Sequence, residues 1–166
     1  MDAIDSLALR LGEALRAVGA QVTTAESCTG GGIAEAITRI AGSSAWFEAG
    51  FVTYSNRQKT LQLGVPEALF EQVGAVSEEV VTAMARGAQR RAGARFAVAV
   101  SGIAGPGGAV PGKPVGTVWL AWVDGEKLRT ERQLFAGDRA AVRQQTQGRA
   151  LEVLLALLDE EKAAQV

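Results

Sequence analysis

The sequence predicts an α/β protein: a single three-layer α/β/α domain with a mixed, mostly parallel sheet and a C-terminal hairpin. Helical and strand-like patterns alternate in the first half of the chain, as in parallel strands joined through helices. Residues 96–100 form a continuous apolar run of strand length, typical of a central strand buried on both faces. Asp124 and Gly125 form a tight-turn signal between the last two strand-like segments.

The first half of the chain gives a clear order of elements. Residues 4–18 place apolar side chains at helical spacing and end at Gly19, which predicts an amphipathic helix. A short strand at 21–25 then leads through a glycine-rich turn into a helix that begins at Ile33 and runs to Gly42. The next predicted elements are a strand at 46–54 and short helices at 56–63 and 66–73, which end at Gly64 and Gly74.

The second half contains the predicted centre and edge of the sheet. Ser77 is a suitable N-cap for a long helix that precedes the central strand at 96–100. A long Gly- and Pro-rich loop at 101–114 separates this strand from another at 115–123. The more polar segment 128–135 is predicted as an edge strand, and Asp138 as the cap of a final helix.

The composition fits one globular domain over residues 1–166, with 48% hydrophobic and 21% charged residues. The formal charge of −1 gives no reason to expect a nucleic-acid partner. The chain has no histidine and one cysteine, Cys28, which excludes Ser-His-Asp and Cys-His mechanisms and histidine-built metal sites. Acid–base chemistry therefore has to come from Lys, Tyr, Asp or Glu.

The same counts favour a cytoplasmic protein. A lone cysteine cannot form an intrachain disulfide, and the start of the chain, with Asp2 and Asp5, lacks the pattern of a secretory signal. No run reaches the roughly 18 to 20 apolar residues needed to cross a bilayer, so we expect no membrane insertion. A homodimer is a reasonable default for a compact protein of this compartment.

Two polar, glycine-containing segments follow predicted strands. The turn from Ser27 to Gly32 precedes a helix, and Ser101 to Pro106 follows the central strand. Serine and threonine there can simply cap a helix, but loops at the carboxyl ends of strands also build ligand crevices in open α/β sheets. Two such loops carrying hydroxyl groups favour a single shared ligand site.

With histidine absent, Lys59 is the candidate base for a serine nucleophile, provided that burial or a cationic neighbour such as Arg57 lowers its pKa. The alternative is a solvated lysine on a surface helix. Arg139 and Arg143, four residues apart, either bind a phosphate or form a solvated helix face. The segment from Gly107 to Lys113 resembles a phosphate-binding loop, but Pro114 and a following strand do not fit that motif.

Several strings occur together in an order that resembles the CinA C-terminal family, whose characterised activity is deamidation of nicotinamide mononucleotide. The strings are TAESCTGG from Thr24, GSSAWF from Gly42, VTYSN from Val52, GAVS from Gly74, SGIAGP from Ser101 and KPVGTV from Lys113. The resemblance implies hydrolysis of the carboxamide to nicotinic acid mononucleotide and ammonia by a serine–lysine mechanism, with no metal and no cofactor.

Position by position, the resemblance puts the nucleophile on Ser27, the base on Lys59 and a supporting hydroxyl on Tyr54. Substrate-binding candidates are backbone N–H groups at Thr29, Gly30 and Gly31 for an oxyanion, with Ser101, Gly102, Thr117 and Arg143 near the ribose or phosphate. Two alternatives stay open: a nucleotide-binding or partner-docking module without turnover, and an amidohydrolase for another small amide.

Overall fold

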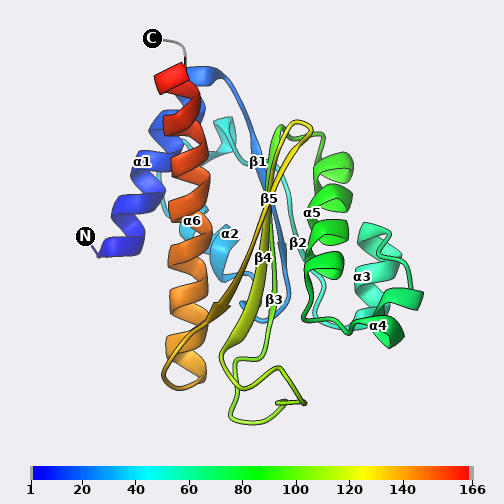
Figure 1. The fold of residues 1–166 in the computed structure, drawn as a ribbon. Helices are drawn as coiled ribbons and strands as arrows, with labels where there is room; N and C mark the ends of the chain where they lie inside the picture. The colour runs from blue at the N-terminus through cyan, green and yellow to red at the C-terminus, as the bar shows by residue number, and fades with distance from the viewer. Residues whose placement is uncertain (1, 165–166) are drawn as a thin grey trace.

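The computed structural model describes residues 2–164, in which a five-stranded sheet lies between two layers of helices (Figure 1). The strand order is β2-β1-β3-β4-β5, with β1 parallel to β2 and β3, while β3–β4 and β4–β5 are antiparallel. The strands are β1 (Val22–Glu26), β2 (Gly50–Val52), β3 (Phe96–Gly102), β4 (Thr117–Asp124) and β5 (Lys127–Leu134). The predicted mixed sheet with a C-terminal hairpin is confirmed.

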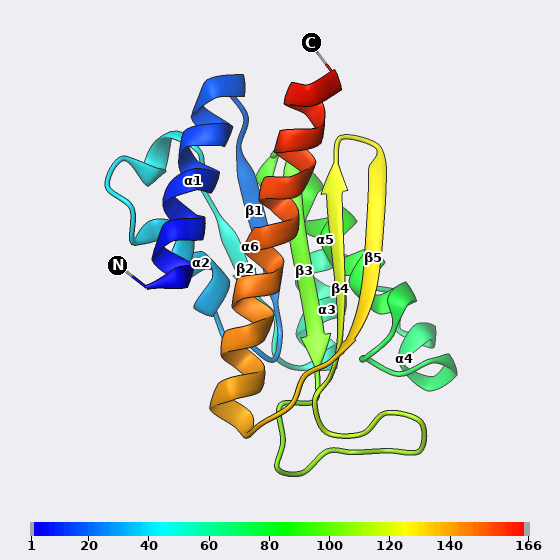
Figure 2. The ribbon, with the colours of Figure 1, turned by 60° about the vertical axis from the view of Figure 1, so that its left-hand side comes forward.

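Helices cover both faces of the sheet, which gives the predicted three layers (Figure 2). One face packs against α1 (Ala3–Val18), α2 (Gly32–Thr38) and α6 (Arg139–Ala164), and the other against α5 (Glu78–Ala92), beside α3 (Asn56–Leu63) and α4 (Ala68–Gln72). Each face has its own cluster of buried apolar side chains. Among the helices within residues 2–164, none is both long and apolar enough to span a membrane.

The central position of β3 follows from its sequence. Each residue from Phe96 to Val100 is fully buried, because β1 pairs on one side, β4 on the other, and helices cover both faces. Local signals also define the ends of helices. The Ser77 side chain accepts from the Val80 N–H at the start of α5, and the Asp138 side chain accepts from the Ala141 N–H at the start of α6. Gly64 ends α3 in the left-handed region, with a φ of 73°.

The predicted strand at 46–54 is mostly wrong. A short 3₁₀ helix, η1 (Ser43–Ala45), precedes Trp46, and only Gly50–Val52 joins the sheet as β2. Trp46 is buried against α1, where Gly12 leaves room for its ring and the Arg16 guanidinium lies 5.3 Å from the ring centroid. Packing of this side chain under α1 therefore outweighs the strand propensity of the segment.

The parallel strands β1, β2 and β3 end at the same edge of the sheet, and their following segments converge there. Ser27 follows β1, Thr53 and Tyr54 follow β2, and Ser101 lies at the end of β3. The loop at 103–116 extends beyond this edge (Figure 1). This is the edge at which open α/β sheets bind their ligands.

Candidate active site

The turn after β1 holds Ser27 in the lining of a cavity. Its side chain is 9% exposed, and its N–H donates to the Val100 carbonyl at 3.2 Å, which ties the turn to β3. Gly30 and Gly31 have φ values of 59° and 102°, a region that side-chain-bearing residues rarely adopt. The two glycines therefore let the chain reverse from β1 into α2 within a few residues.

Lys59 meets Ser27 at the base of this turn. The Lys59 Nζ lies 3.1 Å from the Ser27 Oγ and donates to the Tyr54 carbonyl oxygen at 3.1 Å. The Lys59 side chain is 2% exposed, and burial lowers its pKa to about 8. Arg57, the expected cationic neighbour, is exposed, so desolvation rather than charge repulsion produces this shift.

Tyr54 contributes to this pair through its backbone. Its carbonyl oxygen accepts from Lys59 Nζ and also lies 3.4 Å from Ser27 Oγ. Tyr54 is 60% exposed, and its hydroxyl accepts from Arg139 Nη2 at 3.0 Å. Among residues 2–164, the Tyr54 hydroxyl has no hydrogen bond to Ser27 or Lys59, so the expected supporting hydroxyl does not bond to the serine–lysine pair.

A cavity of about 220 Å³ surrounds the Ser27–Lys59 pair. Its lining comes from the segments after β1 and β2, the end of β3 and the residues after it, α3, the segment between α4 and α5, and α6. The lining residues are Ser27, Cys28, Tyr54, Asn56, Lys59, Ala75, Val76, Ser101, Gly102, Ala104 and Arg139. Ser101 and Gly102 thus lie where the sequence predicts. Asn56, Ala75 and Val76 were not predicted, although all three occur within the strings shared with the family.

Thr117 is not part of this cavity. It is fully buried at the start of β4, and its hydroxyl donates to the Pro114 carbonyl at 2.7 Å. The expected substrate contact is therefore replaced by a turn-stabilising hydrogen bond. Lys113 is likewise engaged in the fold, because its Nζ donates to the Val73 carbonyl at 2.6 Å.

The first turn of α2 is occupied by the chain's own carboxylate. Glu26 is fully buried and accepts from the Ile33 N–H at 2.7 Å, the Ala34 N–H at 3.0 Å and the Thr29 hydroxyl at 2.6 Å. These helix N–H groups are thus not free for a substrate anion. A charged residue ending a buried strand was the signal for this role, and the sequence interpretation missed it.

Of the predicted oxyanion donors, Gly30 is also engaged, because its N–H donates to the Ser27 carbonyl at 3.0 Å. Within residues 2–164, the N–H groups of Thr29 and Gly31 have no hydrogen-bond partner. Thr29 is fully buried, so an unpaired N–H there is unusual. The donors available to a ligand are therefore fewer than the sequence suggested.

The two arginines of α6 have different partners. Arg143 donates through Nε to the Cys28 carbonyl at 3.1 Å and through Nη2 to the Thr29 carbonyl at 3.2 Å. Arg139 bonds to Tyr54 and to the Gly105 carbonyl at 2.9 Å. Both line a second cavity of about 700 Å³, which shares Ala104 and Arg139 with the first.

Cys28 is the other nucleophile-type residue beside Ser27. It lines the first cavity, but it is buried, and burial raises its thiol pKa to about 11. The thiolate is thus scarce near neutral pH. In residues 2–164, no cluster of three or more His, Cys, Asp or Glu side chains could hold a metal ion.

The chain is an α/β protein with a cavity at the carboxyl ends of its parallel strands, where open α/β sheets bind their ligands. A family model described as the CinA C-terminal domain matches residues 4–158, and the chain belongs to this family. The protein of Pseudomonas putida named nicotinamide-nucleotide amidohydrolase PncC is 73% identical over 157 residues, covering 95% of this chain and 98% of that protein.

A second curated relative and a solved structure are also similar to this chain over most of its length. The identically named protein of Escherichia coli (strain K12) is 57% identical over 150 residues, covering 89% of this chain and 90% of that protein. The crystal structure of competence/damage inducible protein CihA from Agrobacterium tumefaciens superimposes with a TM-score of 0.92 at 45% identity, over 95% of this chain and 96% of that one.

Proposed function

We propose that this chain hydrolyses the carboxamide of nicotinamide mononucleotide to nicotinic acid mononucleotide and ammonia, with Ser27 as nucleophile and Lys59 as base. The observation that supports this most strongly is the 3.1 Å contact between Ser27 Oγ and a lysine whose pKa is lowered to about 8 by burial. The names of the relatives from Pseudomonas putida and Escherichia coli support the substrate.

In the proposed reaction, neutral Lys59 takes the proton of Ser27 as Oγ forms a bond to the amide carbon. Negative charge develops on the carbonyl oxygen, and the unpaired N–H of Thr29 is our candidate donor to it. The Lys59 ammonium then protonates the amide nitrogen, the C–N bond breaks, and ammonia leaves an ester on Ser27. Water, deprotonated by Lys59, hydrolyses that ester to the carboxylate and restores Ser27.

The two adjoining cavities suggest how the nucleotide lies. The 220 Å³ cavity contains the serine–lysine pair and suits a single pyridine ring with its carboxamide. The ribose and phosphate would then extend into the 700 Å³ cavity, past Arg139 at the boundary between the two. The phosphate would meet a guanidinium there, which suits it in charge and geometry.

The contact between Ser27 and the buried Lys59 also favours an enzyme over a binding module without turnover. A pocket that only binds a nucleotide does not need an amine of lowered pKa beside a hydroxyl. The direct test is ammonia release by the purified protein from nicotinamide mononucleotide, with nicotinamide and its riboside as comparison substrates. Turnover of the nucleotide alone supports the proposal, equal turnover of all three indicates another small amide as substrate, and no ammonia from any contradicts it.

Replacing Arg139 with glutamine is expected to raise KM for nicotinamide mononucleotide about tenfold, since a hydrogen bond to a charged group contributes roughly 1.5–3 kcal/mol. The value of kcat should stay within about twofold, because the contact lies away from the amide carbon. Steady-state kinetics with Arg10→Gln, an exposed arginine on α1, as matched control measures this. An unchanged KM would remove Arg139 from phosphate binding.

Replacing Cys28 with serine is expected to keep kcat/KM within about threefold, because a thiol with a raised pKa contributes no thiolate at neutral pH. The same steady-state assay, run beside Ser27→Ala, measures it. A loss in Cys28→Ser that matches the loss in Ser27→Ala, together with inactivation by iodoacetamide, would instead indicate a cysteine hydrolase.

A further inference from the structure

Two side chains of opposite charge make hydrogen bonds to the turn that carries Ser27. The Glu26 carboxylate accepts from the Thr29 hydroxyl and from two N–H groups in the first turn of α2. The Arg143 guanidinium donates to the carbonyl oxygens of Cys28 and Thr29. Neither residue touches Ser27 Oγ or Lys59 Nζ, yet both fix the backbone that directly follows the serine.

The Arg143 contacts determine which way the backbone N–H groups point. In a trans peptide, the C=O and the N–H of the next residue point in opposite directions. Because the carbonyls of Cys28 and Thr29 both meet Arg143, the N–H groups of Thr29 and Gly30 point away from it. The Gly30 N–H donates to the Ser27 carbonyl, so the Ser27 carbonyl lies on the side of the turn opposite Arg143.

The Thr29 N–H is directed to that same side. It belongs to the peptide bond that joins Cys28, a cavity-lining residue, to Thr29, and it has no partner within residues 2–164. A buried, unpaired donor whose direction is fixed in advance is the feature that stabilises a developing oxyanion without reorganisation. The orientation of that N–H stays fixed only while the carbonyl of the same peptide, that of Cys28, keeps its hydrogen bond to Arg143.

We propose that Arg143 and Glu26 are positioning residues that hold the Thr29 N–H in place as an oxyanion donor, and that Arg143 is not the phosphate ligand. This inference rests on the proposed serine mechanism. Arg143 acts by binding two carbonyls at once, which its planar guanidinium does and a lysine ammonium does poorly. Glu26 acts by accepting two hydrogen bonds at Oε1 and one at Oε2, and a glutamine amide nitrogen in place of either oxygen cannot accept.

Arg143→Lys and Glu26→Gln are therefore expected to lower kcat for nicotinamide mononucleotide by about tenfold or more, given that loss of one oxyanion donor costs about 10²–10³. KM should stay within about twofold. Arg149→Lys is the matched control, because Arg149 also lies on α6 but pairs with Glu131 and Glu152. A raised KM with unchanged kcat in Arg143→Lys would make Arg143 a phosphate contact and overturn the proposal.

Substrate affinity in a Ser27→Ala background gives a second, independent measurement. Adding Arg143→Lys to Ser27→Ala should leave the Kd for nicotinamide mononucleotide within about twofold, because no binding contact is lost. A tenfold weaker Kd would overturn the positioning role. Thermal unfolding of each variant shows whether a kcat loss comes with a folded protein, and Arg143→Gln replaces Arg143→Lys if the lysine variant does not fold.

A fluorophosphonate probe separates failure of this inference from failure of the proposed substrate. The probe phosphonylates an activated serine with loss of fluoride, whatever amide the protein acts on, and its rate depends on the oxyanion donors. We expect labelling of Ser27 to be about tenfold slower in Arg143→Lys than in the unmodified protein or Arg149→Lys. Equal rates, or no labelling of the unmodified protein, would overturn the inference even if ammonia is released.

Discussion

Ser27→Ala is expected to lower kcat for nicotinamide mononucleotide by a factor of about 10³ or more, because removal of a serine nucleophile abolishes the covalent route. KM should change little, since Ser27 Oγ makes contacts with Lys59 and Tyr54 rather than with a distant part of the substrate. The serine side chain is small and lines the cavity, so loss of its hydroxyl should leave the fold intact. Single-turnover ammonia release measures the effect.

The control for this variant is Ser44→Ala, an exposed serine in η1 that should keep full activity. Mass spectrometry of the unmodified protein mixed rapidly with substrate should find the acyl group on the peptide that contains Ser27. Retention of activity by Ser27→Ala would contradict the proposed nucleophile. Ser101, the other serine hydroxyl in the cavity, would then be the residue to replace.

Lys59→Arg is expected to lower kcat by about 10²–10⁴, the usual contribution of a general acid–base group. A guanidinium keeps the positive charge but does not lose its proton at any accessible pH, so it cannot accept the proton of Ser27. Lys59→Met removes the amine from a buried position without leaving a charge there, and it should be equally inactive and at least as well folded.

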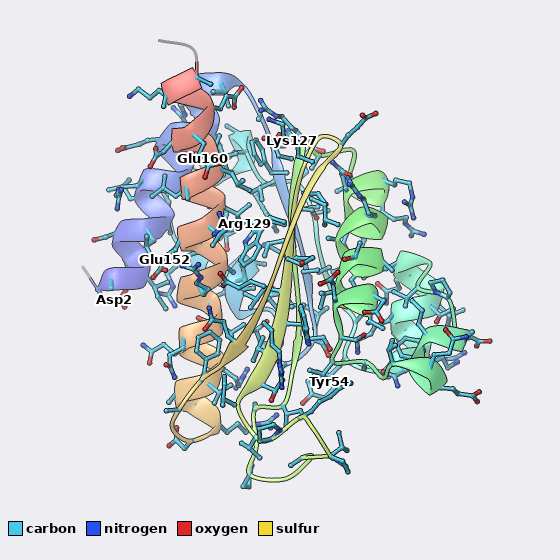
Figure 3. The ribbon with its side chains drawn as sticks, in the orientation of Figure 1. Asp2, Tyr54, Lys127, Arg129, Glu152 and Glu160 are labelled. Atoms are coloured by element: carbon cyan, nitrogen blue, oxygen red, sulfur yellow. The ribbon has the colours of Figure 1, made fainter. Side chains whose placement is uncertain are left out.

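The kinetic pattern distinguishes a base from a structural lysine. Both variants should bind nicotinamide mononucleotide with nearly unchanged Kd, whereas Lys127→Arg, an exposed position on β5 shown in Figure 3, should behave like the unmodified protein. Normal kcat in Lys59→Arg would remove Lys59 from the chemistry. Weak binding with normal kcat would make it a substrate contact.

The fold was largely predictable because the signals are local. The apolar run ending at Val100, the turn at Asp124 and Gly125, and the caps at Ser77 and Asp138 each act within a few residues. The strand predicted around Trp46 failed because that side chain is placed by contact with Gly12 in α1, a partner that periodicity does not show.

Sequence reasoning named the two side chains of the proposed pair, but not the hydrogen bonds around them. The absence of histidine made Lys59 the candidate base, and the resemblance to the CinA C-terminal family put the nucleophile on Ser27. Sequence could not show that Glu26 fills the first turn of α2, or that Arg143 binds backbone carbonyls. A donor's partner depends on tertiary geometry, and polar side chains compete for the same N–H groups only once the elements have packed.

The pH dependence of kcat/KM tests most directly whether a buried, neutral Lys59 activates Ser27. Burial disfavours the protonated amine, so the fraction of neutral base rises with pH through the lowered pKa of about 8. We expect kcat/KM to rise about tenfold per pH unit on the acid side, to bend near pH 8 and then to level off. A profile that stays flat from about pH 6 to pH 10, or that bends only near the ordinary lysine value of about 10.4, would contradict the role of Lys59 as the base.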